Sequence, residues 1–139
     1  MGVCLCVAGG GIPLLTFGIG TFSPEDIEGA MATHSQCILN AMRLAQNPTH
    51  LTSFESSGSD LERGRGAVRF GDTILSLFGF TPELMNETVV LAIACRFFDR
   101  HKFRDRTGNE LTVREFVQLI AAENQNTGWV ELARSVTGR

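Results

Sequence analysis

The sequence predicts an all-α protein built around a central hydrophobic helical hairpin. Three observations support this: capping-box spacings that open helices, apolar residues recurring every three or four positions, and no alternating strand pattern of any length. The chain has 139 residues, of which 43% are hydrophobic and 19% charged, a composition typical of a globular domain with one core. We therefore expect one bundle of six or seven helices.

The first helix is expected to begin at Ser23, with Pro24 at its first position, and to end at Asn47-Pro48. Within it, apolar residues form a single stripe that also contains His34, for which a packing role is expected. The apolar members are Ile27, Met31, Ile38, Ala41 and Ala45.

Residues 1–22 form an apolar N-terminal segment without a charged side chain, ahead of a helical domain at 23–139. The segment lacks the basic start of a secretory signal, and Gly9 to Gly11 with Pro13 interrupt any spanning helix. We expect this segment to be buried or to cover a groove.

The central hairpin is predicted from two runs that are apolar on nearly all sides, Phe70 to Phe78 and Val89 to Phe98. A second helix should begin at the capping box of residues 59–62 and break near Gly64 to Gly66. A buried strand gives a similar apolar run, but the length of these runs favours helices.

The C-terminal part is expected to hold two helices. Thr112 and Glu115 have the capping-box spacing, and the helix they open should stop near Asn124. Turn residues follow, and Trp129, the only tryptophan, opens a last short helix.

Charge and cysteine content narrow the classes of function. A formal net charge of −3 gives no electrostatic reason for nucleic-acid binding, which needs a basic surface. The four cysteines form no C-x-x-C pair and lie in apolar contexts, which indicates reduced thiols and a cytoplasmic protein. No cofactor, metal site or catalytic residue is expected.

Two alternative functions remain open at this point. An EF-hand-like calcium sensor is suggested by residues 104–116, although Arg104 and Arg106 stand where carboxylate ligands belong. A small thiol enzyme is suggested by Cys37 and His34, three residues apart on one helical face.

Taken together, the motifs resemble the Bcl-2 family of apoptosis regulators, and more closely its virus-encoded members. The stretch "LIAAENQNTGWVEL", residues 119–132, resembles the second homology motif, in which Gly128, Trp129 and Leu132 have structural roles. The stretch "VRFGDTI", residues 68–74, resembles the first homology motif with phenylalanine in place of its tryptophan. The resemblance covers roughly residues 39–136.

This resemblance implies an anti-apoptotic protein that sequesters the amphipathic, Bim-like helix of pro-apoptotic family members in a hydrophobic groove between the helices flanking Gly71. Asp72 occupies the position of the family's groove arginine, so Arg69 or Arg65 is expected to supply the missing cation. The implied groove residues are Ile38, Met42, Phe54, Leu61, Arg65, Arg69, Phe70, Gly71, Asp72 and Leu75.

The resemblance also carries expectations about location and assembly. No hydrophobic anchor follows the last helix, so stable membrane insertion is not expected, and the protein should lie in the host-cell cytoplasm, peripheral to mitochondria. An unfilled apolar groove favours self-association, so a homodimer is expected.

Overall fold

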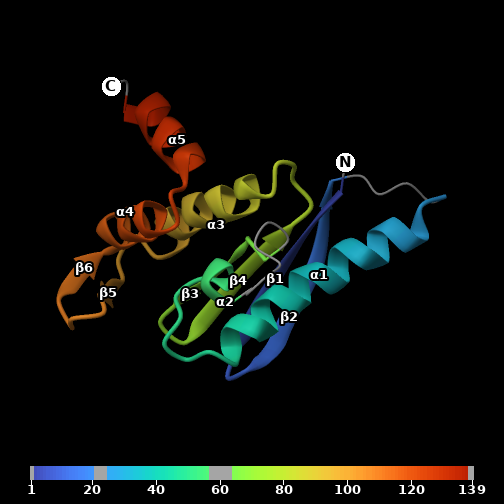
Figure 1. Cartoon of the computed structure of the whole chain (residues 1–139), viewed down its shortest axis with the longest axis horizontal. Coiled ribbons are helices and arrows are strands. Elements are labelled where there is room, and N and C mark those ends of the chain that lie inside the picture. Colours follow the sequence, from blue (N-terminus) through green and yellow to red (C-terminus); the bar gives the residue numbers. More distant parts are fainter. Residues whose placement is uncertain (1, 21–24, 57–63, 138–139) are drawn as a thin grey trace. The chain divides into compact units, whose positions relative to one another are not determined.

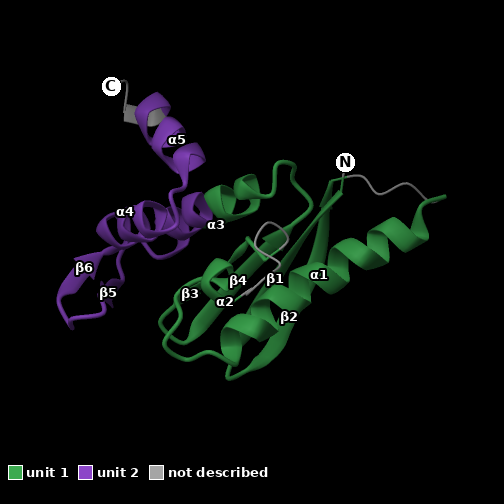
Figure 2. Cartoon of the chain, in the orientation of Figure 1, with its two compact units in different colours: residues 1–90 green, residues 91–139 purple. Residues whose placement is uncertain are grey.

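The computed structural model describes residues 2–20, 25–56 and 64–137, and it shows a mixed α/β protein (Figure 1). The chain divides into two compact units, Met1–Val90 and Leu91–Arg139 (Figure 2). The prediction of an all-α, Bcl-2-like bundle is wrong, because two runs of the chain expected to be helical or groove-covering form a sheet.

Unit 1 is built on a four-stranded antiparallel sheet in the order β2-β1-β4-β3. Its strands are β1 (Gly2–Gly9), β2 (Ile12–Gly20), β3 (Ala67–Phe70) and β4 (Thr73–Phe78). The β1–β2 turn has Gly10 at φ +61° and Gly11 at φ +79°, and glycine adopts these left-handed conformations without steric cost. The segment 1–22 therefore supplies half of the sheet.

Helix α1 (Ile27–Ala45) packs against one face of this sheet. Cys4, Cys6 and Ala8 of β1 point to this face, because side chains alternate along a strand, and they meet Cys37 and Ala41 of the helix. The expected helix is thus confirmed, but its cap is Asp26, whose side chain accepts the Gly29 N–H at 2.9 Å. Ser23 and Pro24 lie outside the described residues.

The predicted helix over Phe70–Phe78 is wrong. A turn at Gly71, with φ +63°, connects β3 to β4 there, and Ile74, Leu75, Ser76 and Leu77 are all buried. A strand covered on both faces has no alternating pattern, which is why this run reads like a buried helix. The capping box at residues 59–62, including Leu61, lies outside the described residues.

Two shorter helices complete unit 1 and lead out of it. Helix α2 (Ser53–Ser56) lies between α1 and β3 in the chain, and α3 (Leu84–Phe97) begins in unit 1 and ends in unit 2. The expected helix over Val89–Phe98 is therefore confirmed, but its expected helical partner is a strand.

Unit 2 contains a hairpin of β5 (Lys102–Arg104) and β6 (Glu110–Thr112), followed by α4 (Val113–Glu123) and α5 (Thr127–Thr137). Its core includes a stacked pair, Phe103 and Phe116, with ring centroids 4.9 Å apart. The predicted capping box is confirmed: Thr112 Oγ1 accepts the Glu115 N–H at 3.2 Å, and Glu115 Oε1 accepts the Thr112 N–H at 3.0 Å. Within the described ranges, no helix is both long enough and apolar enough to cross a membrane.

Candidate functional site: the exposed edge strand

Strand β2 forms an open edge of the sheet in unit 1, at the end of the strand order (Figure 1). It carries no charged side chain, and neither does β1 beside it. Natural sheets usually protect an edge with charges, proline or a covering segment, and β2 has only Pro13. Its large apolar residues are nevertheless exposed, from 39% for Phe17 to 63% for Leu14; the others are Ile12, Leu15 and Ile19.

Three exposed apolar residues of β2 lie on the sheet face opposite α1. Leu15, Phe17 and Ile19 are register partners of Val7, Leu5 and Val3, which alternate with the cysteines that face the helix. Val3 and Leu5 are buried, so the apolar surface begins in the core and continues outward onto β2. A contiguous exposed apolar surface of a few hundred Å² is near the largest that monomeric proteins show, and it often marks a binding site.

The pairing of β2 has one irregularity, which defines the usable length of its edge. The register shifts between Val7 and Ala8, so that Leu14 is a bulge residue without a register partner. From Leu15 to Gly20 the pairing with β1 is regular. Six residues of β2 therefore present a straight edge.

The opposite edge of the sheet, along β3, is closed by the chain itself. Arg69 N–H donates to the Leu51 carbonyl at 2.8 Å, and Ala67 N–H donates to Ser53 Oγ at 3.0 Å. Thr52 forms a β-bridge with Val68. For β2, by contrast, the described residues offer no backbone hydrogen-bond partner beyond β1.

Helix α1 also carries exposed apolar side chains. Ile27 is 66% exposed and Met31 is 63% exposed, and both belong to the apolar stripe that ends at Ala45. Ala45, at the other end of this stripe, lines a small cavity together with residues of both the β1–β2 turn and the β3–β4 turn, and α1 contacts all four strands of the sheet.

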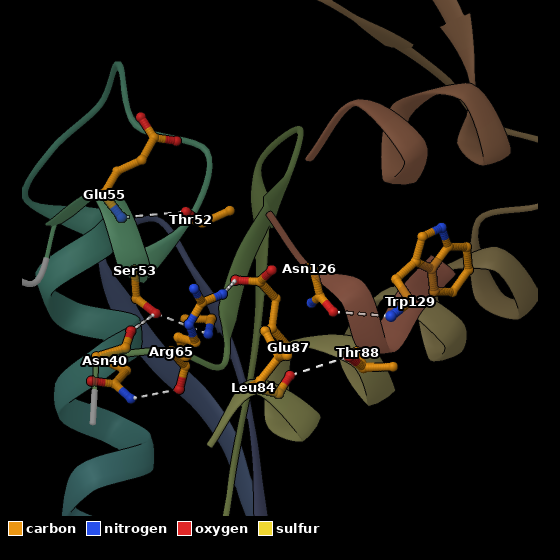
Figure 3. Close-up of polar contacts among 12 residues, drawn as sticks. Asn40, Thr52, Ser53, Glu55, Arg65, Leu84, Glu87, Thr88, Asn126 and Trp129 are labelled. Atoms are coloured by element: carbon orange, nitrogen blue, oxygen red, sulfur yellow. Dashed lines mark hydrogen bonds and ion pairs between the residues drawn. The ribbon is translucent and has the colours of Figure 1, made fainter. Parts of the chain in front are cut away.

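Unit 1 contains a buried polar cluster around Arg65 and Glu87 (Figure 3). The side chain of Arg65 is 10% exposed, that of Glu87 is fully buried, and Arg65 Nη1 lies 3.7 Å from Glu87 Oε2. The guanidinium lies over the Phe54 ring, 3.8 Å from its centroid, while Asn40 Nδ2 of α1 donates to the Arg65 carbonyl at 3.3 Å. The cluster connects α1, α2 and α3 and leaves the Arg65 guanidinium little exposed to a ligand.

Arg69, the expected partner of an incoming carboxylate, is engaged within the protein. Its Nη2 donates to the carbonyls of Leu44 at 2.6 Å and Asn47 at 3.3 Å, and its Nε donates to the carbonyl of His50 at 3.0 Å. These carbonyls lie at and just after the C-terminus of α1, where a cation is favoured by the helix dipole. Arg69 therefore stabilises the end of α1.

The other expected groove residues do not line one groove. Phe70 and Leu75 are buried in the sheet on the face opposite α1, whereas Ile38 and Met42 pack on the α1 side. Gly71 and Asp72 are exposed at a hairpin turn. They border, with Arg69, a cavity of about 230 Å³ at the turns.

Cys37 lacks the features of a nucleophile. It is fully buried, its Sγ–H has the Cys4 and Ser76 carbonyls as acceptors at 3.3 Å each, and burial raises the pKa of its thiol far above the ordinary range. His34 Nδ1 lies 2.9 Å from the Ala30 carbonyl. A reactive thiolate needs an exposed, electropositive setting, so the geometry does not favour the thiol-enzyme alternative.

The loop between β5 and β6 has no calcium-binding arrangement. Asp105 Oδ1 accepts hydrogen bonds from the Thr107 hydroxyl and from the N–H groups of Thr107 and Asn109, and these bonds, that of the hydroxyl first, lower the pKa of its carboxyl. Arg104 Nη1 donates to the Gly108 carbonyl at 2.9 Å. Among the described residues, no three acidic, histidine or cysteine side chains cluster in a way that could hold a metal ion.

Unit 2 contains a cavity of about 590 Å³ lined by Arg96, Arg114, Asp99 and Cys95. Burial raises the pKa of the Cys95 thiol, and the charge of Arg114 partly opposes this. The N-terminus of α4 borders the cavity, but the capping box already bonds the N–H groups of Thr112 and Glu115, which leaves it a weaker anion site.

The C-terminal motif residues are half-buried in α5. Trp129 N–H donates to Asn126 Oδ1 at 3.0 Å, so Asn126 caps the helix that the sequence predicted. The Trp129 indole N–H is buried and has no hydrogen-bond partner in the described part of the chain. Gly128 and Leu132 are partly buried, which fits a packing role for this motif.

Sequence reasoning missed β2 as a site. Two apolar runs separated by Gly9, Gly10 and Gly11 are a hairpin signal, and the absence of charge over residues 1–22 was visible. Comparison with known proteins adds no relative: no protein-family model matches this chain, and neither a curated protein nor a solved structure matches it.

Proposed function

We propose that this chain is a protein-interaction domain that binds an extended, uncharged, apolar segment of a protein partner by strand addition to β2. The observation that supports this most directly is that the β2 edge is uncharged, apolar and open, whereas the opposite edge, along β3, is closed. In strand addition, main-chain hydrogen bonds supply affinity, and pockets for alternate side chains supply specificity.

The chemistry of the edge selects the partner class. An incoming segment gains backbone hydrogen bonds from Leu15 to Gly20 and buries apolar side chains against Leu15, Phe17 and Ile19. A charged residue there loses hydration without a counter-charge, because β1 and β2 carry none. The preferred partner is therefore a neutral, β-branched or aromatic strand.

The helix-in-groove function implied by the Bcl-2 resemblance lacks its site in this fold. That function needs helices on both sides of Gly71, and strands β3 and β4 lie there instead. Arg69, expected to bind the partner's carboxylate, caps α1. We therefore do not extend that proposal to this chain.

A synthetic peptide with the β2 sequence IPLLTFGIG is a suitable probe for strand addition. We expect the labelled peptide to bind the dilute protein, measured by fluorescence anisotropy, and to slow hydrogen exchange of the amides in residues 12–20. The β3 amides should show no change. A peptide with lysine at its central position is the matched control and should bind at least about 100-fold more weakly.

Hydrogen exchange decides the proposal even when the peptide competes with another copy of the protein. If the outward amides of β2 exchange without protection at every protein and peptide concentration, strand addition at this edge is refuted.

We also propose a cytoplasmic location, supported by the four free cysteines, which an oxidising compartment would expose to disulfide chemistry.

A further inference from the structure

We infer that the strand added to β2 is β2 of a second copy of this chain, paired antiparallel about a two-fold axis at Phe17. The inference rests on the proposed function, because it names the partner of that same edge. It joins two four-stranded sheets into one continuous sheet of two copies.

The lack of charge favours self-pairing. A two-fold axis brings each residue of an edge close to its own copy, so any charged side chain near the axis would meet a like charge. From Gly2 to Gly20 no side chain is charged, and no such repulsion arises. A neutral edge is therefore self-complementary.

The register follows from the pattern of the regular part of β2. A two-fold axis makes the pairing antiparallel, and Leu15, Phe17 and Ile19 are spaced evenly about Phe17 on one face. Placing Phe17 opposite Phe17 of the second copy pairs Leu15 with Ile19 in both directions. Shifting one strand by two residues would place Ile19 opposite Pro13 in one direction, or place Leu15 opposite a position beyond Gly20 in the other. Shifting it by one residue would pair side chains that lie on opposite faces of the sheet.

Helix α1 extends the interface on the other face of the sheet. Helix α1 contacts β2, and pairing about a two-fold axis perpendicular to the sheet places both copies of α1 on the same face of the joined sheet, where Ile27 and Met31 are exposed apolar side chains. Stable interfaces bury about 800 Å² per partner. A short strand pair alone is smaller, and the helix stripe and the exposed face of β2 supply further apolar area.

A charge-pair experiment at Phe17 tests the dimer. We expect the wild-type chain to be dimeric in analytical ultracentrifugation, and Phe17→Lys and Phe17→Glu each to raise the dissociation constant at least about 100-fold. Mixing the two variants should restore a heterodimer, because lysine then meets glutamate at the axis. This rescue also shows that both variants are folded.

The matched control is Phe97→Lys in α3, since Phe97 is 73% exposed and belongs to unit 2, not to the unit that contains β2. It should leave the dissociation constant unchanged. A Phe97→Lys effect equal to that of Phe17→Lys, or a dimer that persists in Phe17→Lys, would overturn the assignment of the interface to β2.

Single cysteines at positions 15 to 19, in a Cys95→Ser background, test the register. Under mild oxidation Phe17→Cys should form the inter-copy disulfide at least about tenfold faster than the other four variants, because only position 17 meets itself. Fastest cross-linking at any other position would overturn the proposed register.

The dimer and the proposed function fail in different ways. A wild-type chain that stays monomeric at high concentration but still binds the IPLLTFGIG peptide refutes the homodimer and leaves strand addition intact. A monomer that also fails to bind the peptide, with β2 amides unprotected, refutes both.

Discussion

The buried pair of Arg65 and Glu87 gives the sharpest test of what holds unit 1 together. Replacing Glu87 with alanine leaves the little-exposed Arg65 guanidinium, held over Phe54, without this carboxylate. Breaking a buried ion pair by removing one partner costs about 3–5 kcal/mol. The Nη1 to Oε2 distance of 3.7 Å is too long for a strong hydrogen bond, so we expect the lower end, about 3 kcal/mol.

The assay is urea unfolding followed by far-UV circular dichroism, with Trp129 fluorescence as a separate signal from unit 2. The control is the double variant Arg65→Met with Glu87→Leu, which fills similar volume without charge. We expect it to be more stable than Glu87→Ala, with a coupling energy of about 2 kcal/mol between the two sites. A cost below about 1 kcal/mol for Glu87→Ala, or single costs that simply add, would refute the role given to this pair.

Three further predictions follow from individual contacts. Arg69→Met should lower the free energy of unfolding by about 2 kcal/mol, because three carbonyls near the end of α1 lose a charged donor. The control, Arg100→Met at an exposed position, should change it by less than about 0.5 kcal/mol, and equal effects of the two variants in urea unfolding would contradict the capping role. Thr112→Ala should cost about 1 kcal/mol through loss of the α4 cap, seen as an earlier transition in Trp129 fluorescence, and an unchanged midpoint would count against it. Burial raises the pKa of the Cys37 thiol, so the unfolded chain releases this proton at a lower pH than the folded protein does. The thiol's contribution to stability is therefore present below the ordinary thiol pKa of about 8.5 and is lost as the pH rises above it. Cys37→Ala should flatten this decline in stability, and a pH profile identical to that of the wild type would disprove the reasoning.

Local signals correctly predicted helices α1, α4 and α5. The apolar stripe located α1, and the spacing of Thr112 and Glu115 located the start of α4, because caps depend on residues within one turn. The Asn126 turn likewise marked the start of α5. These elements are specified by neighbours in sequence, which a single chain displays.

The sheet was missed because its central strands hide their periodicity. β1 and β4 lie between other strands and are covered on both faces, so they read as continuous apolar runs like those of a buried helix. Gly71 was placed between two groove-forming helices, although its position before Asp72 between two apolar runs also fits a hairpin turn. Had the glycine turns at Gly10–Gly11 and Gly71 been given more weight than the length of the apolar runs, the sequence would have favoured strands.

The candidate site depends on information that no local pattern contains. The absence of charge in β2 is visible in the sequence, but its exposure follows from which strand ends at the edge. Arg69 shows the same limit, since its three carbonyl partners lie 19 to 25 residues away in the chain.

The unequal edges of the sheet set a limit on stoichiometry. Because residues 51–53 occupy the β3 side, the described part of the chain leaves the sheet of unit 1 one free side, along β2, through which it can grow. A sheet with two free sides could add molecules without end, as in fibrils, whereas one free side is consumed by a single joining event. The blocked β3 side would therefore let the proposed pairing of β2 strands end at a dimer, without growth into a fibril.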